Sequence, residues 1–337
     1  MTGVTRRPTL LVLRALGLGD LLTAVPALRG LSAAFPDHDL VLATPPALGP
    51  LAMLAGVADA IVPADGLDTV AGLPARAIAV NLHGRGPQSH RALLAARPSR
   101  LIAFDHPEIA ESALGPRWRS DEHEVRRWCR LVEAFGVPTD PDALDLLPPD
   151  RPIAERASGA VLLHPGAKDP ARRWPAARWG ELASRLRAAG RRIVVTGGPA
   201  EARLARSVAD LGGLDARAVL TDMEVLDLVA AVAACRLVVA GDTGISHVAT
   251  ATRTRSVLLF GPTSPDRWGP PSHRVGHRVL WSGRAGDPHA AETFVGLLEI
   301  SVEEVLAAVD DSLSGPRRSR PRRETAAGAR REGRPAG

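Results

Sequence analysis

The segment AGDTGISHVATATRTRSVLLFGPTSPDRWGPP, residues 240–271, carries the strongest fold signal in this chain. Its first part reads as a strand end, a Gly-Asp-Thr-Gly turn and the start of a helix. Such a turn directs free backbone N–H groups and the positive end of a helix dipole at one point, which suits a phosphate. Its second part is a β-branched and leucine run that ends in a Gly/Pro loop. Because ligands of open α/β sheets bind at the carboxyl ends of strands, the two turns together predict a pocket for a nucleotide diphosphate.

The composition fits two globular domains of ordinary size. The chain has 337 residues, of which 45% are hydrophobic and only 3% aromatic, so the core must be built from aliphatic side chains. Short β-rich runs alternate with helical patterns, which favours parallel, doubly wound sheets. In the first half, the pattern predicts helices at 20–34 and 121–136 and strands at 9–14, 39–43, 60–62, 77–81 and 100–103.

A Pro/Asp-rich stretch at 137–153, VPTDPDALDLLPPDRPI, interrupts this alternation and predicts a connection between two domains. The alternation then resumes in the second half. We expect strands at 160–164, 192–196, 237–240 and 256–260, and helices at 176–189, 201–211, 225–234 and 301–313. The resulting division is a first domain at 1–137, a linker at 138–153, a second domain at 154–314 and a tail at 315–337.

The basic character of the chain lies in that tail. The formal net charge is +5, and residues 315–337 hold eight Arg and two Glu, which leaves the remaining chain close to neutral. A near-neutral body with few aromatic residues lacks the charge footprint and the stacking platforms of a nucleic-acid binder. The tail has no apolar periodicity, so we expect it to be disordered, with weak attraction to anionic membrane lipid as an added hypothesis.

The two cysteines and the hydropathy pattern bear on the compartment. Cys129 and Cys235 are isolated in apolar, helical surroundings, which predicts buried thiols in a reducing compartment. Arg14 and Asp20 interrupt the apolar run near the N-terminus, and no segment reaches the roughly 18 apolar residues that span a bilayer. The sequence therefore predicts a cytoplasmic location, including the inner face of the membrane.

Three motifs carry a resemblance to a known family. DTG-x-x-H lies at 242–247, FGPT-x-P-x-x-x-GP at 260–270 and L-G-D-x-L-x-x-x-P-x-L at 18–28. Together they resemble glycosyltransferase family 9, which includes the ADP-heptose:lipopolysaccharide heptosyltransferases. The resemblance implies an α/β fold of the GT-B type, in which two facing Rossmann-like domains with parallel sheets enclose an interdomain cleft. It assigns the acceptor to 1–137 and the nucleotide-sugar donor to 154–314.

Asp20 is the candidate catalytic residue. Gly17 and Gly19 allow a tight turn, and a carboxylate at the start of the next helix is favoured as an N-cap and by the helix dipole. Capping alone would explain Asp20. The resemblance implies instead that Asp20 deprotonates the acceptor hydroxyl, and that Gly19 belongs to the acceptor side, although a dipole-stabilised carboxylate is a weaker base.

The loop NLHGRGPQSHR after the fourth predicted strand is the second acceptor-side candidate. It places His83, Arg85 and Gln88 at the edge of the expected cleft, where members of the family contact the acceptor. A polar surface loop is the equally weighted alternative. His123 and Trp128 are expected to be packing residues. Residues 37–39, Asp-His-Asp, have the spacing of a metal-binding DxD motif, but they lie where a strand begins, so we expect no metal there.

The donor side begins with LLHPGAKDPARRWP at 162–175. In register with the Lys-x-Trp-Pro element of the family, Arg172 takes the place of the lysine, and Lys168 lies four positions earlier as another source of positive charge. Thr196 and Gly197, in the turn after the next strand, are expected near the nucleotide.

The Gly-Asp-Thr-Gly turn supplies the remaining donor candidates. Asp242 would hydrogen-bond the sugar hydroxyls, with helix capping as its alternative. Thr243 and Gly244 would offer backbone N–H groups to the diphosphate, and His247 would contact phosphate or support the loop from beneath.

These features predict a metal-independent, inverting glycosyltransferase that needs no cofactor. The donor would be a nucleotide-diphosphate sugar, an ADP-sugar among the options, and the acceptor a hydroxyl of a cell-envelope glycan, a lipid-linked glycan or another glycan. Heptose is implied only by the resemblance, because no motif selects the sugar. Two alternatives stay open: a sugar-nucleotide epimerase of similar fold, and a non-catalytic sugar-nucleotide-binding module whose tail recruits an acidic partner.

Overall fold

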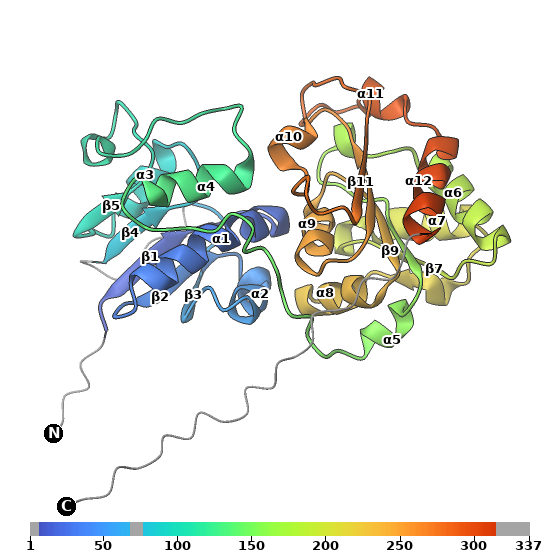
Figure 1. The fold of residues 1–337 in the computed structure, drawn as a ribbon, viewed down its shortest axis with the longest axis horizontal. Coiled ribbons are helices and arrows are strands. Elements are labelled where there is room, and N and C mark those ends of the chain that lie inside the picture. Colours follow the sequence, from blue (N-terminus) through green and yellow to red (C-terminus); the bar gives the residue numbers. More distant parts are fainter. Residues whose placement is uncertain (1–6, 68–76, 315–337) are drawn as a thin grey trace, which may run out of the picture.

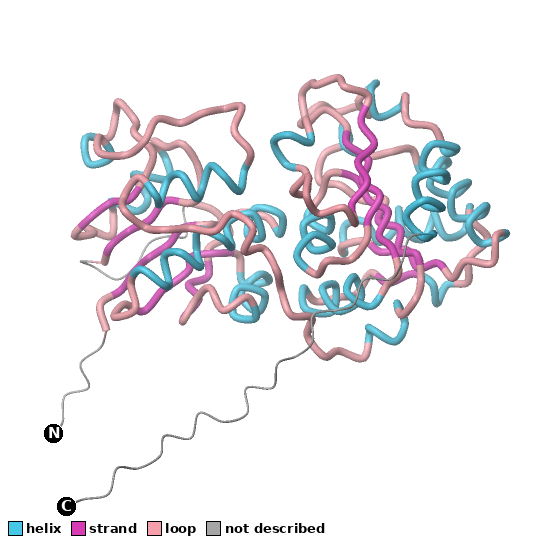
Figure 2. The backbone as a smooth tube through the Cα atoms, viewed as in Figure 1, coloured by secondary structure: helices cyan, strands magenta, loops and turns pink. Residues whose placement is uncertain are grey.

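The computed structural model describes residues 7–67 and 77–314. These residues form two α/β lobes, each built on its own parallel sheet (Figure 1). In each lobe, helices cover the strands, as the secondary-structure colouring in Figure 2 shows. The expected fold, two Rossmann-like domains with parallel sheets, is confirmed. The tail expected to be disordered, 315–337, lies outside the described residues.

The first sheet has the strand order β3-β2-β1-β4-β5. Its central strand, β1, is the apolar run TLLVL, whose last four residues are buried, which explains why it lies between two neighbours. The strands are β1 (Thr9–Leu13), β2 (Asp39–Thr44), β3 (Ala60–Pro63), β4 (Ile78–Asn81) and β5 (Arg100–Ile102). The helices of this lobe are α1 (Leu18–Ala34), α2 (Gly49–Leu54), α3 (Gln88–Leu94) and α4 (Glu124–Glu133).

The second sheet has the strand order β11-β10-β9-β6-β7-β8. Its strands are β6 (Val161–His164), β7 (Ile193–Thr196), β8 (Val219–Leu220), β9 (Leu237–Gly241), β10 (Ser256–Phe260) and β11 (His277–Trp281). Its helices are α5 (Ile153–Ala157), α6 (Ala176–Ala188), α7 (Ala202–Leu211), α8 (Val225–Ala234), α9 (Gly244–Ala251), α10 (Pro265–Trp268), α11 (Val295–Leu298) and α12 (Val302–Ser314). Strands β6, β9 and β10 are each buried along their whole length, as is typical of parallel strands covered on both faces.

Strands β8 and β11 were not predicted. The first has only two residues, too few for a pattern, and the second is a half-exposed edge strand that mixes His, Arg and Trp with aliphatic residues. Two predicted helix starts were also wrong. Helix α1 begins at Leu18, two residues early, because Gly17 takes the N-cap position, and α4 begins at Glu124 because His123 caps it.

The sheet topology fixes where a ligand can bind. In each lobe the strand order reverses direction beside the first strand, so the carboxyl ends of β1 and β4, and of β6 and β9, flank a topological switch point. Open α/β sheets bind ligands at such points. Most of the predicted site residues follow these four strands, whereas Thr196 ends β7 and Gly197 follows it.

The two lobes touch along α1 and α9 (Figure 1). One apolar cluster runs through both lobes, with Val25 and Leu28 from α1 and Ile245 and Val248 from α9. At the tips of the two helices the backbones come close. A Cβ on Gly19 would lie 2.8 Å from His247 Cδ2, and a Cβ on Gly244 would lie 2.9 Å from Leu18 Cβ. Side chains at these two glycines would push the lobes apart.

Polar contacts add to this apolar contact. Arg29 of α1 donates hydrogen bonds to the carbonyl oxygens of Ala143 and Asp145, and the carboxylate of Asp145 pairs with Arg253 and Arg274 of the second lobe. The segment between the sheets is therefore fastened to both lobes.

Two further expectations concern burial and membranes. Cys129 and Cys235 are buried, as expected, and burial raises the pKa of the Cys129 thiol to about 11. In the described ranges, no helix combines the length and the apolar character needed to cross a bilayer.

The packing of α6 on α7 gives a stability test. A Cβ on Gly180 would lie 2.3 Å from Leu211 Cβ. We predict that Gly180→Val lowers the free energy of unfolding by about 1–3 kcal/mol, because extra atoms in a filled contact force side chains and backbone to shift. Ala188→Val, at the exposed end of the same helix, should change it by less than about 0.5 kcal/mol. Urea unfolding curves measure both values. Equal losses would mean that helix propensity, and not the contact, sets the cost.

Candidate active site

Asp20 lies in the first turn of α1, as its third residue. Its Oδ2 accepts a hydrogen bond from the Gly17 N–H at 3.2 Å, so the carboxylate closes the first turn from inside the helix. The N-cap interpretation of Asp20 is wrong, because Gly17 holds that position. The Asp20 side chain is 30% exposed, which leaves part of the carboxylate accessible.

Behind Asp20 lies a buried arginine that the sequence analysis did not select as a site residue. Arg14 follows β1 and is completely buried. Its Nε donates to the Asp20 carbonyl oxygen at 2.9 Å, and its Nη2 lies 3.5 Å from Asp20 Oδ1. A charged residue at the end of an otherwise apolar strand was the signal in the sequence.

Helix α4 supplies the counter-charge for Arg14. Glu124 Oε1 lies 3.3 Å from Arg14 Nη2 and accepts a hydrogen bond from the Trp128 indole at 2.8 Å. Its other oxygen pairs with Arg127. The Trp128 ring also lies against the Arg14 guanidinium, 4.5 Å from its Cζ. Trp128 is buried, as expected for a packing residue, and it also takes part in this charged group.

The loop after β4 brings His83 towards Asp20 and Arg14. Burial lowers the pKa of His83, the nearby charge of Arg14 lowers it further, and Asp20 partly opposes both. His83 Nδ1 is buried without a hydrogen-bond partner among the described residues. Arg85 and Gln88 are exposed, and Gln88 begins α3. Among the three predicted acceptor-side residues on this loop, His83 is the one whose pKa responds to the charges of Asp20 and Arg14.

On the donor side, Asp242 follows β9 and is 5% exposed. Burial raises the pKa of its carboxyl to about 6, although Arg172 and a hydrogen bond with Thr263 act in the opposite direction. The capping alternative for Asp242 is wrong, because Thr243 is the N-cap of α9. Within the described chain, the buried Thr243 Oγ1 has no hydrogen-bond partner, and Gly244 opens the helix. The turn therefore presents unused donors beside a buried carboxyl.

Arg172 reaches this turn from the loop after β6. Its Nη1 lies 3.4 Å from the Asp242 carbonyl oxygen, and its Nη2 pairs with Asp169 at 2.8 Å. Burial alone would raise the pKa of Asp169, yet Arg172 and His289 hold it below its usual value. Lys168 is exposed, and its ammonium forms no ion pair with any residue in the described ranges. Arg172 is thus the cation that the structure brings to Asp242.

The carboxyl ends of β6 and β7 carry a second polar group. The Thr196 hydroxyl lies 3.0 Å from His164 Nδ1, and both side chains are buried. Glu201, which the sequence analysis did not select, lies in front of them, with His164 Nε2 3.8 Å from its Oε2. Gly197 and Gly166 leave the room it needs, since a Cβ on Gly166 would lie 2.2 Å from its carboxyl carbon.

His247 lies on α9 between the two lobes. Burial lowers its pKa to about 4, and the neighbouring His123 lowers it further, so the ring is neutral at pH 7. It packs against Trp268, with ring centroids 5.8 Å apart, and against the backbone of Gly19. A supporting role of His247 beneath the loop stays a prediction, as does a contact with phosphate.

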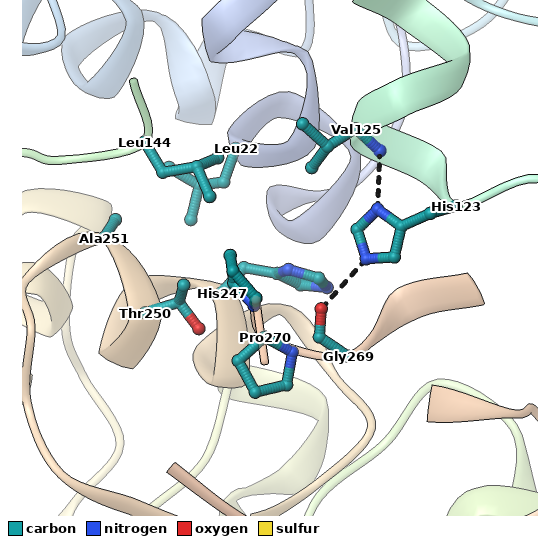
Figure 3. Close-up of a pocket in the computed structure, with 10 residues that line it drawn as sticks. Leu22, His123, Val125, Leu144, His247, Thr250, Ala251, Gly269 and Pro270 are labelled. Carbon is teal, nitrogen blue, oxygen red and sulfur yellow. Dashed lines mark hydrogen bonds between the residues drawn. The ribbon is translucent and has the colours of Figure 1, made fainter. Parts of the chain in front are cut away.

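Figure 3 shows a small cavity beside His247 at the boundary between the lobes. His123 crosses this boundary. Its Nδ1 accepts from the Val125 N–H at 3.2 Å, and its Nε2 donates to the Gly269 carbonyl oxygen at 3.0 Å. The cavity measures about 20 Å³, enough for a water molecule and too little for a sugar. His123 is therefore a bridging residue, and more than the packing residue that we expected.

Within residues 7–67 and 77–314, no group of three or more His, Cys, Asp or Glu side chains is positioned to hold a metal ion. The Asp-His-Asp stretch at 37–39 lies at the amino end of β2, away from the carboxyl-end edge of its sheet. The candidate site therefore consists of carboxylates, an arginine and two helix N-termini.

The raised pKa of Asp242 predicts how the stability of the protein depends on pH. The pKa rises from 3.8 to about 6 on folding, so the folded protein holds more protons than the unfolded chain in this window, and its stability falls as pH rises through it. Asp242→Asn removes this dependence. We predict that the stability of the variant relative to the parent increases by about 2–3 kcal/mol between pH 4 and pH 7. Urea unfolding at four pH values tests this, with the exposed Asp37→Asn as control. A difference that does not change with pH would contradict it.

Comparison with known proteins identifies the family of this chain. The family model described as Glycosyltransferase family 9 (heptosyltransferase) matches residues 115–291, just over half of the chain. Lipopolysaccharide heptosyltransferase 2 of Salmonella typhimurium is 32% identical over 161 residues, which cover 44% of this chain and 45% of that protein. Lipopolysaccharide heptosyltransferase 1 of Pseudomonas aeruginosa is 32% identical over 148 residues, covering 43% and 41%. The matches thus span a little under half the length of these relatives.

Solved structures share the fold over nearly the whole chain. E. coli ADP-heptose lipopolysaccharide heptosyltransferase II superimposes with a TM-score of 0.73 at 21% identity, over 90% of this chain and 98% of that one. A family 9 glycosyltransferase from Veillonella parvula gives 0.74 at 19% identity, over 93% and 99%. The iron-containing dodecameric glycosyltransferase TibC of enterotoxigenic E. coli gives 0.59 at 15% identity, over 91% and 76%. With the family match over half its length and the GT-B fold throughout, the chain belongs to glycosyltransferase family 9.

Proposed function

We propose that this protein is an inverting glycosyltransferase that moves heptose from ADP-heptose to a hydroxyl of a lipopolysaccharide-type glycan. The observation that carries the proposal is the placement of Asp20. A partly exposed carboxylate on the first lobe lies at the N-terminus of α1, and that helix end touches the donor turn of the second lobe. The choice of sugar and acceptor follows the names of the relatives, which are lipopolysaccharide heptosyltransferases.

The reaction is a single displacement. The acceptor O–H gives its proton to the Asp20 carboxylate while its oxygen forms a bond to the anomeric carbon. The bond from that carbon to the diphosphate oxygen breaks, and its electron pair leaves with the nucleoside diphosphate. Since attack and departure occur on opposite faces, the configuration inverts. A positioned base of this kind contributes roughly 10²–10⁴ to the rate.

The second lobe stabilises the departing diphosphate. The N–H groups of Thr243 and Gly244 point from the start of α9, where the helix dipole favours negative charge. Arg172 adds a fixed positive charge 3.4 Å from the backbone of the same turn. Exposed Lys168 supplies a second, mobile charge. Fixed donors and charges of this kind can take the part that a divalent ion plays elsewhere, so we propose that no metal ion is needed.

Two carboxyl groups bind the neutral parts of the donor. Asp242 follows β9 and Glu201 follows β7, on either side of β6, and each keeps acceptor capacity for hydroxyl groups. Gly198 N–H fixes Glu201 through a 2.9 Å hydrogen bond. We place the reaction in the cytoplasm, at the inner face of the membrane when the acceptor is lipid-linked.

The experiment that tests the function combines the protein with ADP-heptose, with and without heptose-deficient lipopolysaccharide core. ADP release and product mass are followed, in the presence and absence of EDTA. We expect release and a heptosylated product only with the acceptor, and no effect of EDTA. Conversion of ADP-heptose without an acceptor would favour an epimerase, and binding without any conversion would favour a binding module.

For the base we predict that Asp20→Asn lowers kcat by ~10²–10⁴, because the amide cannot accept the hydroxyl proton. Its affinity for ADP, measured by calorimetry, should stay at the parent value, since Asp20 belongs to the other lobe. Exposed Asp37→Asn serves as the charge-matched control and should turn over normally. Unchanged kcat in Asp20→Asn would rule out this residue as the base.

For the donor site we predict that Arg172→Ala weakens ADP binding roughly tenfold to a hundredfold, the value of one charge-assisted hydrogen bond. Arg178→Ala is the control, because Arg178 donates hydrogen bonds to the carbonyl oxygens of Leu298 and Ile300 and lies over the Trp174 ring. Calorimetric titration with ADP measures both affinities. Equal affinities of the Arg172 variant and the parent would show that Lys168 or the backbone carries the diphosphate.

A further inference from the structure

The complete burial of Arg14 needs a reason. Taking a guanidinium out of water is costly unless every donor is bound and the charge is balanced. A neutral aliphatic side chain at the end of β1 would fill the same place without that cost. The contacts of Arg14 indicate what the arginine provides in return.

Its donors hold the first turn of α1. Nε donates to the Asp20 carbonyl oxygen at 2.9 Å, and Nη2 lies 3.3 Å from the Thr23 hydroxyl. That hydroxyl in turn donates to the same Asp20 carbonyl oxygen at 2.9 Å. Nη1 donates to the carbonyl oxygen of Leu82, in the loop that carries His83. One planar side chain therefore ties Asp20 to the end of β1 and to the neighbouring loop.

The Asp20 carboxylate is held at both oxygens. Oδ2 accepts from the Gly17 N–H at 3.2 Å, and Oδ1 lies 3.5 Å from Arg14 Nη2. The 30% of the side chain that remains exposed is the part free to meet an acceptor. The carboxylate thus has a fixed direction and one accessible side.

Further charged and ionisable groups surround Arg14 and Asp20. Arg14 and Arg127 carry two buried positive charges, and Glu124 carries a negative charge between them. Glu122 and Arg267 also act on Arg127. The rings of His83 and His247 lie near the same helix end, and both have pKa values lowered chiefly by burial, so they add no charge at pH 7. His123, which caps α4 on the same side, uses both ring nitrogens in hydrogen bonds. Glu124 is therefore the carboxylate that pairs Arg14 with α4.

We propose that Arg14 is a positioning residue of the active site, which fixes the Asp20 carboxylate in one direction, with Glu124 and Trp128 holding Arg14 in place. This inference rests on the proposed role of Asp20 as the base. An arginine suits the task because its fork reaches Asp20, Thr23, Leu82 and Glu124 at once, which the single ammonium of a lysine cannot do.

The test compares Arg14→Lys and Arg14→Gln with the matched control Arg130→Lys. Arg130 lies on α4, pairs with Glu122 at 2.7 Å and lies over the Phe104 ring, but it does not contact Asp20. We expect Arg14→Lys to lower kcat about 10–100-fold while ADP affinity stays constant, since a slightly misplaced base costs this much. Arg14→Gln, which keeps fewer of these hydrogen bonds and no charge, should lower kcat at least as much, again with constant ADP affinity. Arg130→Lys should match the parent in both measurements.

A second readout does not depend on turnover. The carbon-13 chemical shift of the Asp20 carboxyl at pH 7, assigned by its absence in Asp20→Asn, should differ between Arg14→Lys and the parent and stay unchanged in Arg130→Lys. If Arg14→Gln does not fold, Thr23→Val, which removes the hydroxyl between Arg14 and Asp20, should still lower kcat with ADP affinity kept. Unchanged kcat in Arg14→Lys, or an equal loss in Arg130→Lys, would overturn the proposal. Full turnover in Asp20→Asn would instead overturn the role of Asp20 as the base, while the carboxyl chemical shift would still decide whether Arg14 holds it.

Discussion

The N-terminal turns of α1 and α9, which belong to different lobes, are in contact, and the candidate site depends on that contact. The tips of α1 and α9 come together only because Gly19 and Gly244 have no side chains there. Both tips are positive ends of helix dipoles, so they repel each other unless negative charge is present. Asp20 supplies it on one side, and in the proposed reaction a diphosphate supplies it on the other. The two adjacent helix N-termini favour two negative groups, and these would be the base that activates the acceptor and the leaving group of the donor.

Much of the fold was predictable because its signals are local. Buried parallel strands such as β6 and β10 are short, uninterrupted apolar runs, and turns rich in Gly and Pro separate them from helices. The elements that were missed have no such local signal. β8 has only two residues. β11 is an edge strand, and its position in the sheet depends on pairing with β10, which is distant in sequence. The helix starts at Leu18 and Glu124 were misplaced because capping depends on backbone geometry that residue preferences only approximate.

The residues of the candidate site also fall into those that the sequence could indicate and those that it could not. Asp20, Asp242 and Arg172 lie in motifs of a few residues, so the sequence could point to each of them. Arg14 and Glu124 are 110 positions apart and meet only after β1 and α4 have packed together. Nor does a pattern reveal that Asp242 is buried deeply enough to raise its pKa to about 6. Pairing between distant residues and the degree of burial are properties of the folded chain.

The connection through Asp145 has a consequence for how the lobes hold each other. Its carboxylate is 40% exposed and pairs with Arg253 and Arg274, one of them itself more than half exposed. Mobile ions screen such pairs, whereas they leave the apolar contact between α1 and α9 almost untouched. The ion pairs of Asp145 therefore weaken as ionic strength rises, whereas the apolar contact between the lobes does not. Salt concentration becomes a means of loosening the connecting segment while the helix tips stay in register.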